Sequence, residues 1–305
     1  MDQVKSTRSI WSFYGVIALI FITAWGIAAF MITVFINEFD RAEFRNKIGF
    51  LPILIISMMG LAVYFAKTYF KHAPTVIIDK NRVQFNNRVY SIDDIAYIKF
   101  SGKYQCGLGY ILMEGAEITF QNGAREYIFD SMFTNFFLLK QYLRHVIKSD
   151  EGRFEASKIE AARGIYEEHY YSYKGYFLLN FRTMMLLFII SLPLFIKSER
   201  DITVPALVIT VLLSLLFSRQ FNYFGLSDKY FRIKNHIRFW KNDLYRIEDI
   251  EEVVFESDQR APHGLRLILK DFTTKFFLAA TLNDSKWKEL EEELTKYNIK
   301  VRNLI

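Results

Sequence analysis

The chain has one cysteine, Cys106, and only five prolines in 305 residues. A single cysteine excludes an intrachain disulfide framework and a cysteine-built zinc cage, and it fits a reducing compartment. The five histidines form no H-E-x-x-H pair, and the sequence contains neither a phosphate loop nor G-x-S-x-G. We therefore predict no catalytic residues, no metal site and no cofactor, and we expect a protein that is not an enzyme.

Two acidic pairs are the remaining candidates for catalysis, Asp93 with Asp94 and Glu248 with Asp249. Neighbouring carboxylates can divide the duties of acid and base. Adjacent positions on a chain point in different directions, however, and no histidine accompanies the pairs at a fixed spacing. We interpret them as turn residues that bond to backbone amides.

Charged residues are absent from residues 11–36, 48–66 and 202–218. Residues 176–196 contain a single charged residue, Arg182. About 20 apolar helical residues cross the hydrocarbon layer of a membrane, so we predict four transmembrane helices in two hairpins. The first apolar run is much longer than the core of a cleaved signal peptide. Arg182 lies near the start of its segment, where a long side chain can reach the headgroups.

An even number of spans before each soluble stretch places the N-terminus and both stretches on one side of the membrane. The basic residues that flank the spans on this side are Lys5, Arg8, Lys67, Lys71, Lys174, Arg182 and Arg219. Those on the other side are Arg41, Arg45, Lys47, Lys197 and Arg200. The larger set on the first side predicts a multi-pass protein of the cell membrane with both soluble stretches in the cytoplasm.

The chain also contains an internal repeat. The stretch V-I-I-D-K-N-R-V-Q-F, which starts at Val76, ends in K-N-R-V-Q-F, and these six residues match K-N-H-I-R-F within the stretch F-R-I-K-N-H-I-R-F-W, which starts at Phe231. In this alignment Lys80 falls on Lys234, and one inserted residue later Y-S-I-D-D-I at residues 90–95 falls on Y-R-I-E-D-I at residues 245–250. A fixed repeat predicts two copies of one folding unit.

Each soluble stretch has short β-rich runs separated by turn signals, followed by an amphipathic helix. In the first copy the helix begins at a Thr134 cap and has an apolar stripe. The stripe residues are Phe136, Leu139, Leu143 and Val146 in the first copy, and Trp287, Leu290, Leu294 and Tyr297 in the second. We predict an antiparallel meander whose open end is covered by the helix.

These patterns give the expected domain organisation. Residues 1–70 are an N-terminal segment with the first hairpin, and residues 71–148 are the first soluble module. Residues 149–174 are read as a charged connecting helix, interrupted at Gly152 and Gly164. Residues 175–223 contain the second hairpin, and residues 224–305 form the second module.

The residues 90–98 (Y-S-I-D-D-I-A-Y-I), 245–253 (Y-R-I-E-D-I-E-E-V) and the later Y-I-F-D-S-M-F-T-N-F resemble those of bacterial pleckstrin-homology-like membrane proteins. The resemblance covers most of the chain, once in each copy. It implies an α+β membrane protein in which each hairpin is followed by an antiparallel pleckstrin-homology-like β-barrel with a C-terminal helix. It also implies membrane attachment and binding or scaffolding, with no catalytic residues to transfer.

A basic stretch from Arg219 to Arg246 leads from the second hairpin into the second module, and it contains Tyr223, Tyr230 and Trp240. Its candidate binding residues for lipid headgroups or a partner are Arg219, Lys229, Arg232, Lys234, His236, Arg238 and Lys241. Each basic group near an anionic membrane surface contributes about 1 kcal/mol. A solvated positive face that only follows the topology rule is the alternative explanation.

We therefore predict a non-enzymatic scaffold or binding protein that presents two cytoplasmic modules to anionic lipids or a protein partner, and we expect no nucleic-acid partner. A transporter or channel subunit with regulatory modules is the main alternative, because it would share the multi-pass architecture. That alternative predicts a polar path between the spans, which the apolar composition of these segments does not favour.

Overall fold

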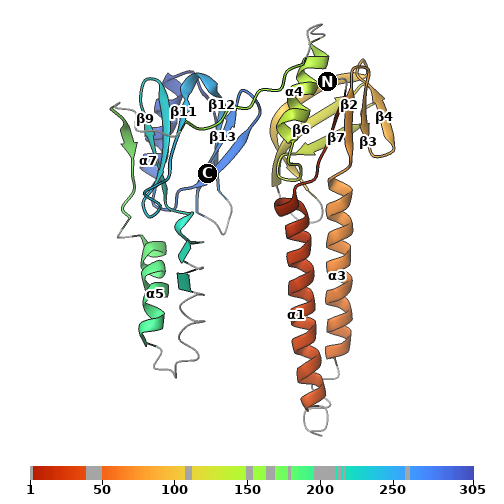
Figure 1. Ribbon diagram of the computed structural model, residues 1–305, viewed down its shortest axis with the longest axis vertical. Coiled ribbons are helices and arrows are strands. Elements are labelled where there is room, and N and C mark those ends of the chain that lie inside the picture. The colour runs from red at the N-terminus through yellow and green to blue at the C-terminus, as the bar shows by residue number, and fades with distance from the viewer. Residues whose placement is uncertain are drawn as a thin grey trace. The chain divides into compact units, whose positions relative to one another are not determined.

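The computed structural model describes residues 3–38, 50–106, 112–148, 154–162, 169–177, 180–195, 210–211, 214–215, 217–257 and 262–305 (Figure 1). The chain divides into two compact units, Met1–Ala156 and Ser157–Ile305. Each unit combines helices with mainly antiparallel sheets, so the fold class is α+β.

The first unit contains two antiparallel sheets, ordered β1-β2-β3-β4 and β5-β6-β7. The strands are β1 (Gln3–Lys5), β2 (Val76–Asp79), β3 (Arg82–Phe85), β4 (Arg88–Ser91), β5 (Ile95–Gln105), β6 (Leu112–Phe120) and β7 (Arg125–Phe129). The helices are α1 (Gly15–Glu38), which follows a π-helical turn at Ile10–Tyr14, α3 (Leu51–His72) and α4 (Phe136–Ile147).

Helices α1 and α3 lie side by side (Figure 1). Ile10–Asn37 and Leu51–His72 are long and apolar enough to cross a membrane, by length and composition. Their buried positions include Ala24, Ala28 and Ala62, and such small residues allow helix backbones to approach closely. Only 11% and 17% of the most apolar window of each helix is buried, so neither helix has the burial of a soluble core helix.

The helix pair is inserted between two neighbouring strands, because β1 precedes α1 and pairs with β2 after α3. Val4 of β1 is buried opposite Ile78. The side chain of Asn135 accepts a hydrogen bond from the Thr7 amide and donates one to the Lys5 carbonyl, each at 2.8 Å. Both ends of the helix pair are therefore attached to the sheets of the same unit.

Helix α4 closes the core of this unit, as its apolar stripe predicts, since Leu139 and Leu143 are fully buried. The predicted threonine cap is wrong. The helix begins at Phe136, and the Thr134 hydroxyl instead donates to the Arg8 carbonyl at 3.4 Å. The Thr134 hydroxyl, which we predicted to cap the helix, thus binds the N-terminal arm, residues 3–9, instead.

The second unit also contains two sheets, ordered β11-β10-β9-β8 and β14-β13-β12-β15. The strands are β8 (Tyr171–Tyr173), β9 (Asn222–Leu226), β10 (Tyr230–Asn235), β11 (Asn242–Arg246), β12 (Ile250–Glu256), β13 (Gly264–Leu269), β14 (Thr274–Leu278) and β15 (Lys300–Leu304). A 3-10 turn at Ile247–Asp249 precedes β12, and the helices are α5 (Phe181–Phe195) and α7 (Asp284–Lys296). The predicted stripe of α7 is confirmed for Trp287, Leu290 and Leu294, which are buried, whereas Tyr297 follows the end of the helix and is partly buried.

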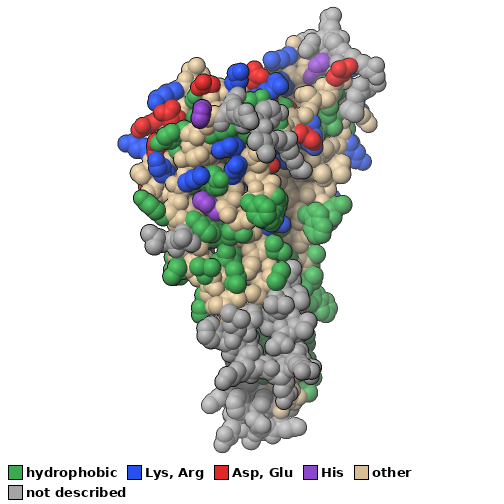
Figure 2. Space-filling model, turned by 60° about the vertical axis from the view of Figure 1, so that its left-hand side comes forward, with side chains coloured by type: hydrophobic (Ala, Val, Ile, Leu, Met, Phe, Trp, Pro, Cys, Tyr) green, Lys and Arg blue, Asp and Glu red, His purple; other side chains and the backbone are tan. Residues whose placement is uncertain are grey.

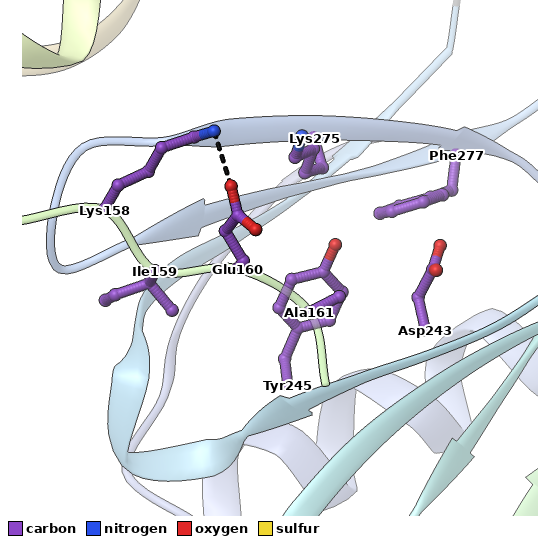
Figure 3. A pocket seen from close by; sticks show the side chains of 8 residues that line it. All are labelled: Lys158, Ile159, Glu160, Ala161, Asp243, Tyr245, Lys275 and Phe277. Atoms are coloured by element: carbon purple, nitrogen blue, oxygen red, sulfur yellow. Dashed lines mark hydrogen bonds and ion pairs between the residues drawn. The ribbon is translucent and has the colours of Figure 1, made fainter. Parts of the chain in front are cut away.

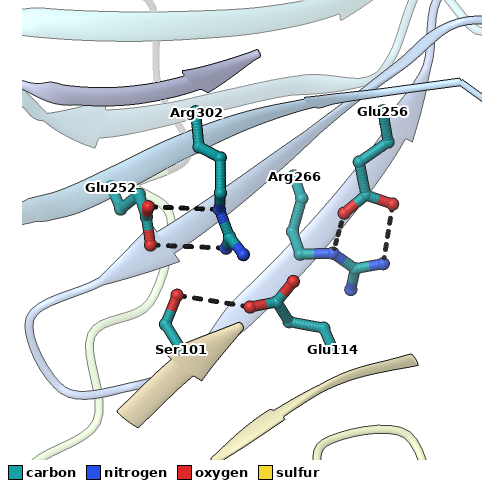
Figure 4. A network of polar contacts seen from close by, with 6 residues as sticks. All are labelled: Ser101, Glu114, Glu252, Glu256, Arg266 and Arg302. Atoms are coloured by element: carbon teal, nitrogen blue, oxygen red, sulfur yellow. Dashed lines mark hydrogen bonds and ion pairs between the residues drawn. The ribbon is translucent and has the colours of Figure 1, made fainter. Parts of the chain in front are cut away.

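The last strand, β15, pairs with β12 in parallel. The buried Glu252 of β12 forms ion pairs with Arg302 at 3.3 Å and Lys300 at 3.1 Å, both on β15. On the same sheet the Arg266 guanidinium binds Glu256 through two hydrogen bonds (Figure 4). Charged pairs therefore join the strands of this sheet, in addition to the backbone ladder.

The prediction of four transmembrane helices in two hairpins is wrong. Within the described part of the chain, only α1 with its preceding turn and α3 meet the criteria for a span. Helix α5 is described over 15 residues, Phe181–Phe195, fewer than the roughly 20 that a span needs. Most of the predicted fourth span, residues 202–218, lies outside the described residues. The predicted single barrel is also replaced by two sheets in each unit.

The connecting helix predicted for residues 149–174 is not found in its described parts, residues 154–162 and 169–174. Ala162 instead forms a bridge to Leu244, and Tyr171–Tyr173 forms strand β8 on the edge of β9. Gly152 and Gly164 lie outside the described residues. Backbone groups of Ala162 and of Tyr171–Tyr173 form their hydrogen bonds with the edges of sheets. Contacts with a distant sheet edge do not produce a periodic pattern in the local sequence.

The repeat is real, but part of its predicted alignment is wrong. Both copies place a strand before a helical segment and pair it with the strand that follows, β1 with β2 and β8 with β9. Asn86 and Asn87 alone connect β3 to β4, whereas residues 236–241 connect β10 to β11. Lys80 therefore lies in the turn before β3, while Lys234 lies within β10.

Candidate functional site

Strand β10 presents a polar face and an apolar face. Phe231 and Ile233 are buried in the core between the sheets, whereas Arg232 and Lys234 lie on the opposite face. In the neighbouring strand β9, Gly225 pairs with Arg232 and Tyr223 pairs with Lys234. The period of two residues in a strand therefore places two of the predicted basic residues side by side.

Lys174 and His236 join these two residues, and we call the four residues Lys174, Arg232, Lys234 and His236 the basic face. Burial lowers the pKa of Lys234, and the nearby Arg232 and Lys174 lower it further. The pKa of His236 is also lowered, first by burial and then by Lys174. No carboxylate contributes to either shift, so the positive charges act on one another without compensation.

Aromatic rings, and not carboxylates, support the basic face. The Arg232 guanidinium lies 3.8 Å from the centre of the Tyr170 ring, and the Lys174 ammonium lies 5.0 Å from the centre of the Tyr223 ring. The imidazole of His236 stacks on Phe177, with ring centres 5.0 Å apart. These contacts fix the side chains in place and leave the charges of Arg232 and Lys174 available.

Gly225 lies beneath Arg232 and Tyr170. A Cβ atom at this position would lie 3.4 Å from both Arg232 Nε and Tyr170 Cβ, which is ordinary van der Waals contact. The arrangement therefore leaves room for a small side chain here.

The basic face has unused hydrogen-bond donors. Arg232 Nε and His236 Nε2 are buried and have no hydrogen-bond partner among the described residues. Within the same residues, none of the four members forms an ion pair with a carboxylate. An unpaired buried polar group costs about 1–3 kcal/mol, so an anion that accepts these hydrogen bonds would be stabilised here.

Two of the predicted binding residues have structural partners instead. Arg238 donates from Nε to Ser218 Oγ at 2.8 Å and from Nη2 to the Leu215 carbonyl at 2.5 Å. Lys241 donates to Asn222 Oδ1 at 2.9 Å, and burial lowers its pKa. These residues fasten the β10–β11 connection to the first residue of β9 and to the segment that precedes it.

The remaining predicted residues lie apart from the basic face. Lys229 is in the turn before β10, beside a shallow cavity of about 490 Å³ that is also lined by Arg246 and Glu248. Arg219 is exposed and lies close enough to Arg238 to lower its pKa, an effect smaller than that of burial. Of the seven predicted residues, the structure therefore places Arg232, Lys234 and His236 together.

Lys174 was predicted only as a membrane flank, and its place in the site was missed. It follows Tyr173, which pairs with Phe224 of β9, so the pairing of β8 with β9 brings Lys174 alongside Tyr223. The pairing of two strands about 50 residues apart is not visible in a local sequence pattern, because the alternation along one strand does not show which distant strand lies beside it. A comparison of β8 with β1 of the first unit is the signal that could have identified it.

A second cavity, of about 560 Å³, lies between the segment 158–161 and the edges of β11 and β14 (Figure 3). Tyr245 and Phe277 point into it, and Lys158 forms an ion pair with Glu160 at its rim. The amide of Ile159 donates to Asp271 Oδ2 at 2.5 Å and so fixes this segment. Charges of both signs line the cavity, which distinguishes it from the basic face.

The distribution of charge on the surface is uneven. Figure 2 shows charged side chains of both signs over the sheets, while hydrophobic side chains are frequent over the helices. Within the described residues, no group of three or more His, Cys, Asp or Glu side chains could hold a metal ion. The unpaired side-chain donors of Arg232 and His236 fit the binding of an anion.

No protein-family model and no curated protein matches this chain.

Proposed function

We propose that this protein is a non-enzymatic membrane protein whose C-terminal unit binds anionic lipid headgroups through the basic face. The observation that supports this proposal best is the convergence of Lys174, Arg232, Lys234 and His236 without carboxylate partners. A phosphate group offers several acceptor oxygens, which suits a guanidinium and an imidazole with unpaired N–H groups.

The helix pair α1–α3 supports the membrane part of the proposal. Large apolar side chains such as Ile22, Phe30 and Ile56 are mostly exposed on these helices. Exposed apolar surface of this extent is costly in water and is stable in lipid. No Asp, Glu, Lys, Arg or His occurs in residues 15–37 or 51–66, which favours a lipid-facing pair over a transport path.

The same arrangement supports the proposed relationship to pleckstrin-homology-like modules. Each unit has two sheets and one helix, α4 or α7, that covers its core, although in the second unit strand β15 follows the helix. We place both units on the cytoplasmic side, where anionic lipids are available in the inner leaflet. A protein partner for these units remains compatible with the same surfaces.

The test is a binding titration of the full-length protein in neutral detergent with short-chain phosphatidylglycerol and, separately, phosphatidylcholine. We expect selective binding of phosphatidylglycerol. The double variant R232Q/K234Q should bind it about 30-fold more weakly, because each cation contributes about 1 kcal/mol. Lys288→Gln, on the exposed face of α7, is the matched control and should bind as the wild type does.

Both variants are compared with the wild type by thermal unfolding, so that loss of binding is separated from loss of fold. A parallel titration with inorganic phosphate shows whether the phosphate group alone is recognised. Equal affinity of wild type and R232Q/K234Q for phosphatidylglycerol, with both proteins folded, would contradict the proposal.

A further inference from the structure

The connection between β10 and β11 presents two exposed aromatic side chains. Phe239 is 84% exposed and Trp240 is 66% exposed, and their rings contact each other edge to face with centres 5.0 Å apart. Two adjacent aromatic residues on a protruding turn form an apolar surface that the unit itself does not cover. We call residues 236–241 the aromatic tip.

The aromatic tip is held in a defined conformation. The side chain of Asn235 is buried and accepts hydrogen bonds from the amides of Ile237 and Arg238, at 3.0 and 2.9 Å. The Lys241 amide donates to the Arg238 carbonyl at 2.8 Å. The aromatic pair is therefore presented in advance, and its burial would cost little conformational entropy.

The aromatic tip lies beside the apolar helical segments of the second unit. The Arg238 guanidinium binds the Leu215 carbonyl and Ser218 Oγ, and Leu215 belongs to the apolar stretch 202–218. Arg182, the second residue of α5, donates to the side chain of Gln220 at 3.1 Å. The cations Arg182 and Arg238 thus lie where the apolar segments join the sheets of the second unit. Cationic and exposed apolar side chains also occur together at a membrane–water interface.

Phe181, at the start of α5, is also 80% exposed. Tryptophan is enriched where protein crosses the headgroup layer, because its ring is apolar and its N–H remains hydrated. Protein acceptors hold the guanidinium groups of Arg182 and Arg238 in place, and both groups keep their positive charge there. Exposed aromatic side chains and positive charge together fit a bilayer better than an aqueous surface.

We infer that Phe239 and Trp240 are inserted into the headgroup region of the bilayer and orient the second unit on it. This inference rests on the proposed membrane function. It concerns the second unit alone, since the equivalent connection in the first unit consists of Asn86 and Asn87. The β10–β11 connection is longer than the β3–β4 connection, and it contains the aromatic residues Phe239 and Trp240 and the basic residues Arg238 and Lys241. The two copies therefore have different surfaces at this turn.

The experiment uses the full-length chain in phosphatidylcholine vesicles, with Cys106 replaced by alanine and one spin label at a time. The labelled variants are W240C, F239C, K288C on the exposed face of α7, and V63C on the exposed face of α3. Collision of the label with oxygen reports lipid, and collision with a water-soluble nickel complex reports water. Neutral lipid is chosen so that the result does not depend on headgroup charge.

We expect the ratio of oxygen to nickel collisions at positions 239 and 240 to be several-fold higher than at 288 and to approach that at 63. Nickel access at 239 and 240 equal to that at 288, with position 63 in lipid, would overturn the inference and leave the membrane attachment intact. Nickel access at position 63 as well would overturn both. Protection of 239 and 240 from both reagents would indicate a protein contact and would also overturn the inference.

Discussion

Cys106 reports on the folding of the first unit because its thiol is buried at the end of β5. Burial raises the pKa of the thiol to about 11. The reactive thiolate is therefore scarce at neutral pH, and a reagent has little access to the sulfur. We predict slow alkylation by iodoacetamide at pH 8 in the folded protein and fast alkylation in denaturant. Equal rates under the two conditions would contradict the burial of this residue.

A buried ion pair also belongs to the first unit. Lys140 of α4 and Asp130 after β7 are each almost completely buried, and Lys140 Nζ lies 2.5 Å from Asp130 Oδ1. Such a pair stabilises little relative to apolar residues, but removing one member leaves a buried charge without its partner. The cost of a single substitution should therefore exceed the cost of replacing both residues.

We predict that Lys140→Met lowers the free energy of unfolding by about 3–5 kcal/mol. The double variant D130N/K140M should lose less, because no buried charge remains. The measurement is the denaturant concentration at which Cys106 becomes reactive in each variant. A double variant that is less stable than K140M would show that the pair has another role.

His236 gives the second unit a dependence on pH. Burial, together with Lys174, lowers its pKa below the ordinary value of 6.5. The folded protein keeps this imidazole neutral, whereas the unfolded chain takes up a proton as the pH falls below about 6.5. The contribution of His236 to stability is therefore present above pH 6.5 and is lost as the pH falls toward the lowered pKa.

We predict that the thermal midpoint of the wild type falls more steeply between pH 7 and pH 5 than that of H236Q, which has no such proton to bind. The measurement is thermal unfolding of the lipid-free full-length protein in neutral detergent across this range. Parallel curves for the two proteins would show that His236 binds its proton equally in the folded and unfolded states.

At the scale of elements, β15 stabilises an edge of the second unit. It supplies a parallel ladder to β12, and Arg302 pairs with the buried Glu252 (Figure 4). Lys300 of β15 forms a second ion pair with the same carboxylate. We predict that deletion of residues 299–305 lowers the free energy of unfolding by about 3–5 kcal/mol, because Glu252 loses both cations. The measurement is again thermal unfolding of the full-length and shortened proteins.

The matched control for this deletion is Glu252→Gln. In the shortened chain it should restore part of the lost stability, since a neutral amide is cheaper to bury than a carboxylate. In the full-length chain the same change should destabilise, because it removes the acceptor of the two cations. If Glu252→Gln changes the free energy of unfolding equally in both chains, β15 stabilises the unit through its backbone hydrogen bonds and not through the ion pairs.

Local patterns predicted α4 and α7 well, because a helix reveals its buried face through nearby residues. Leu139 and Trp287 are buried as the spacing indicated. The same patterns did not predict the contacts of residues 157–162 or the pairing of β15 with β12. Those contacts depend on sheet edges that lie far away in the sequence, so short-range periodicity contains no information about them.

The site was predicted in part for the same reason. Alternation along β10 places Arg232 and Lys234 on one face, and this is visible in the sequence. Arg238 and Lys241 were included because they are basic, but they bind Ser218 and Asn222 instead. The basic composition of a stretch does not distinguish charges that bind a ligand from charges that fasten a turn.

At the scale of the whole molecule, the account depends on the helix pair α1–α3. Its insertion between β1 and β2 fixes both of its ends to one unit, whatever covers its apolar surface. In a bilayer this connection would place the first unit and the N-terminal arm on the same side. The proposal places the second unit on that side as well, with its basic face toward the inner leaflet.

The most direct measurement of this claim is the labelling of single cysteines by a membrane-impermeant maleimide. The background is Cys106→Ala, and the reporters are Asn87→Cys in the first unit and Lys288→Cys in the second, both at exposed positions. We predict that both cysteines react in inside-out membrane vesicles and that neither reacts in intact cells. Reaction of either cysteine in intact cells would contradict the account.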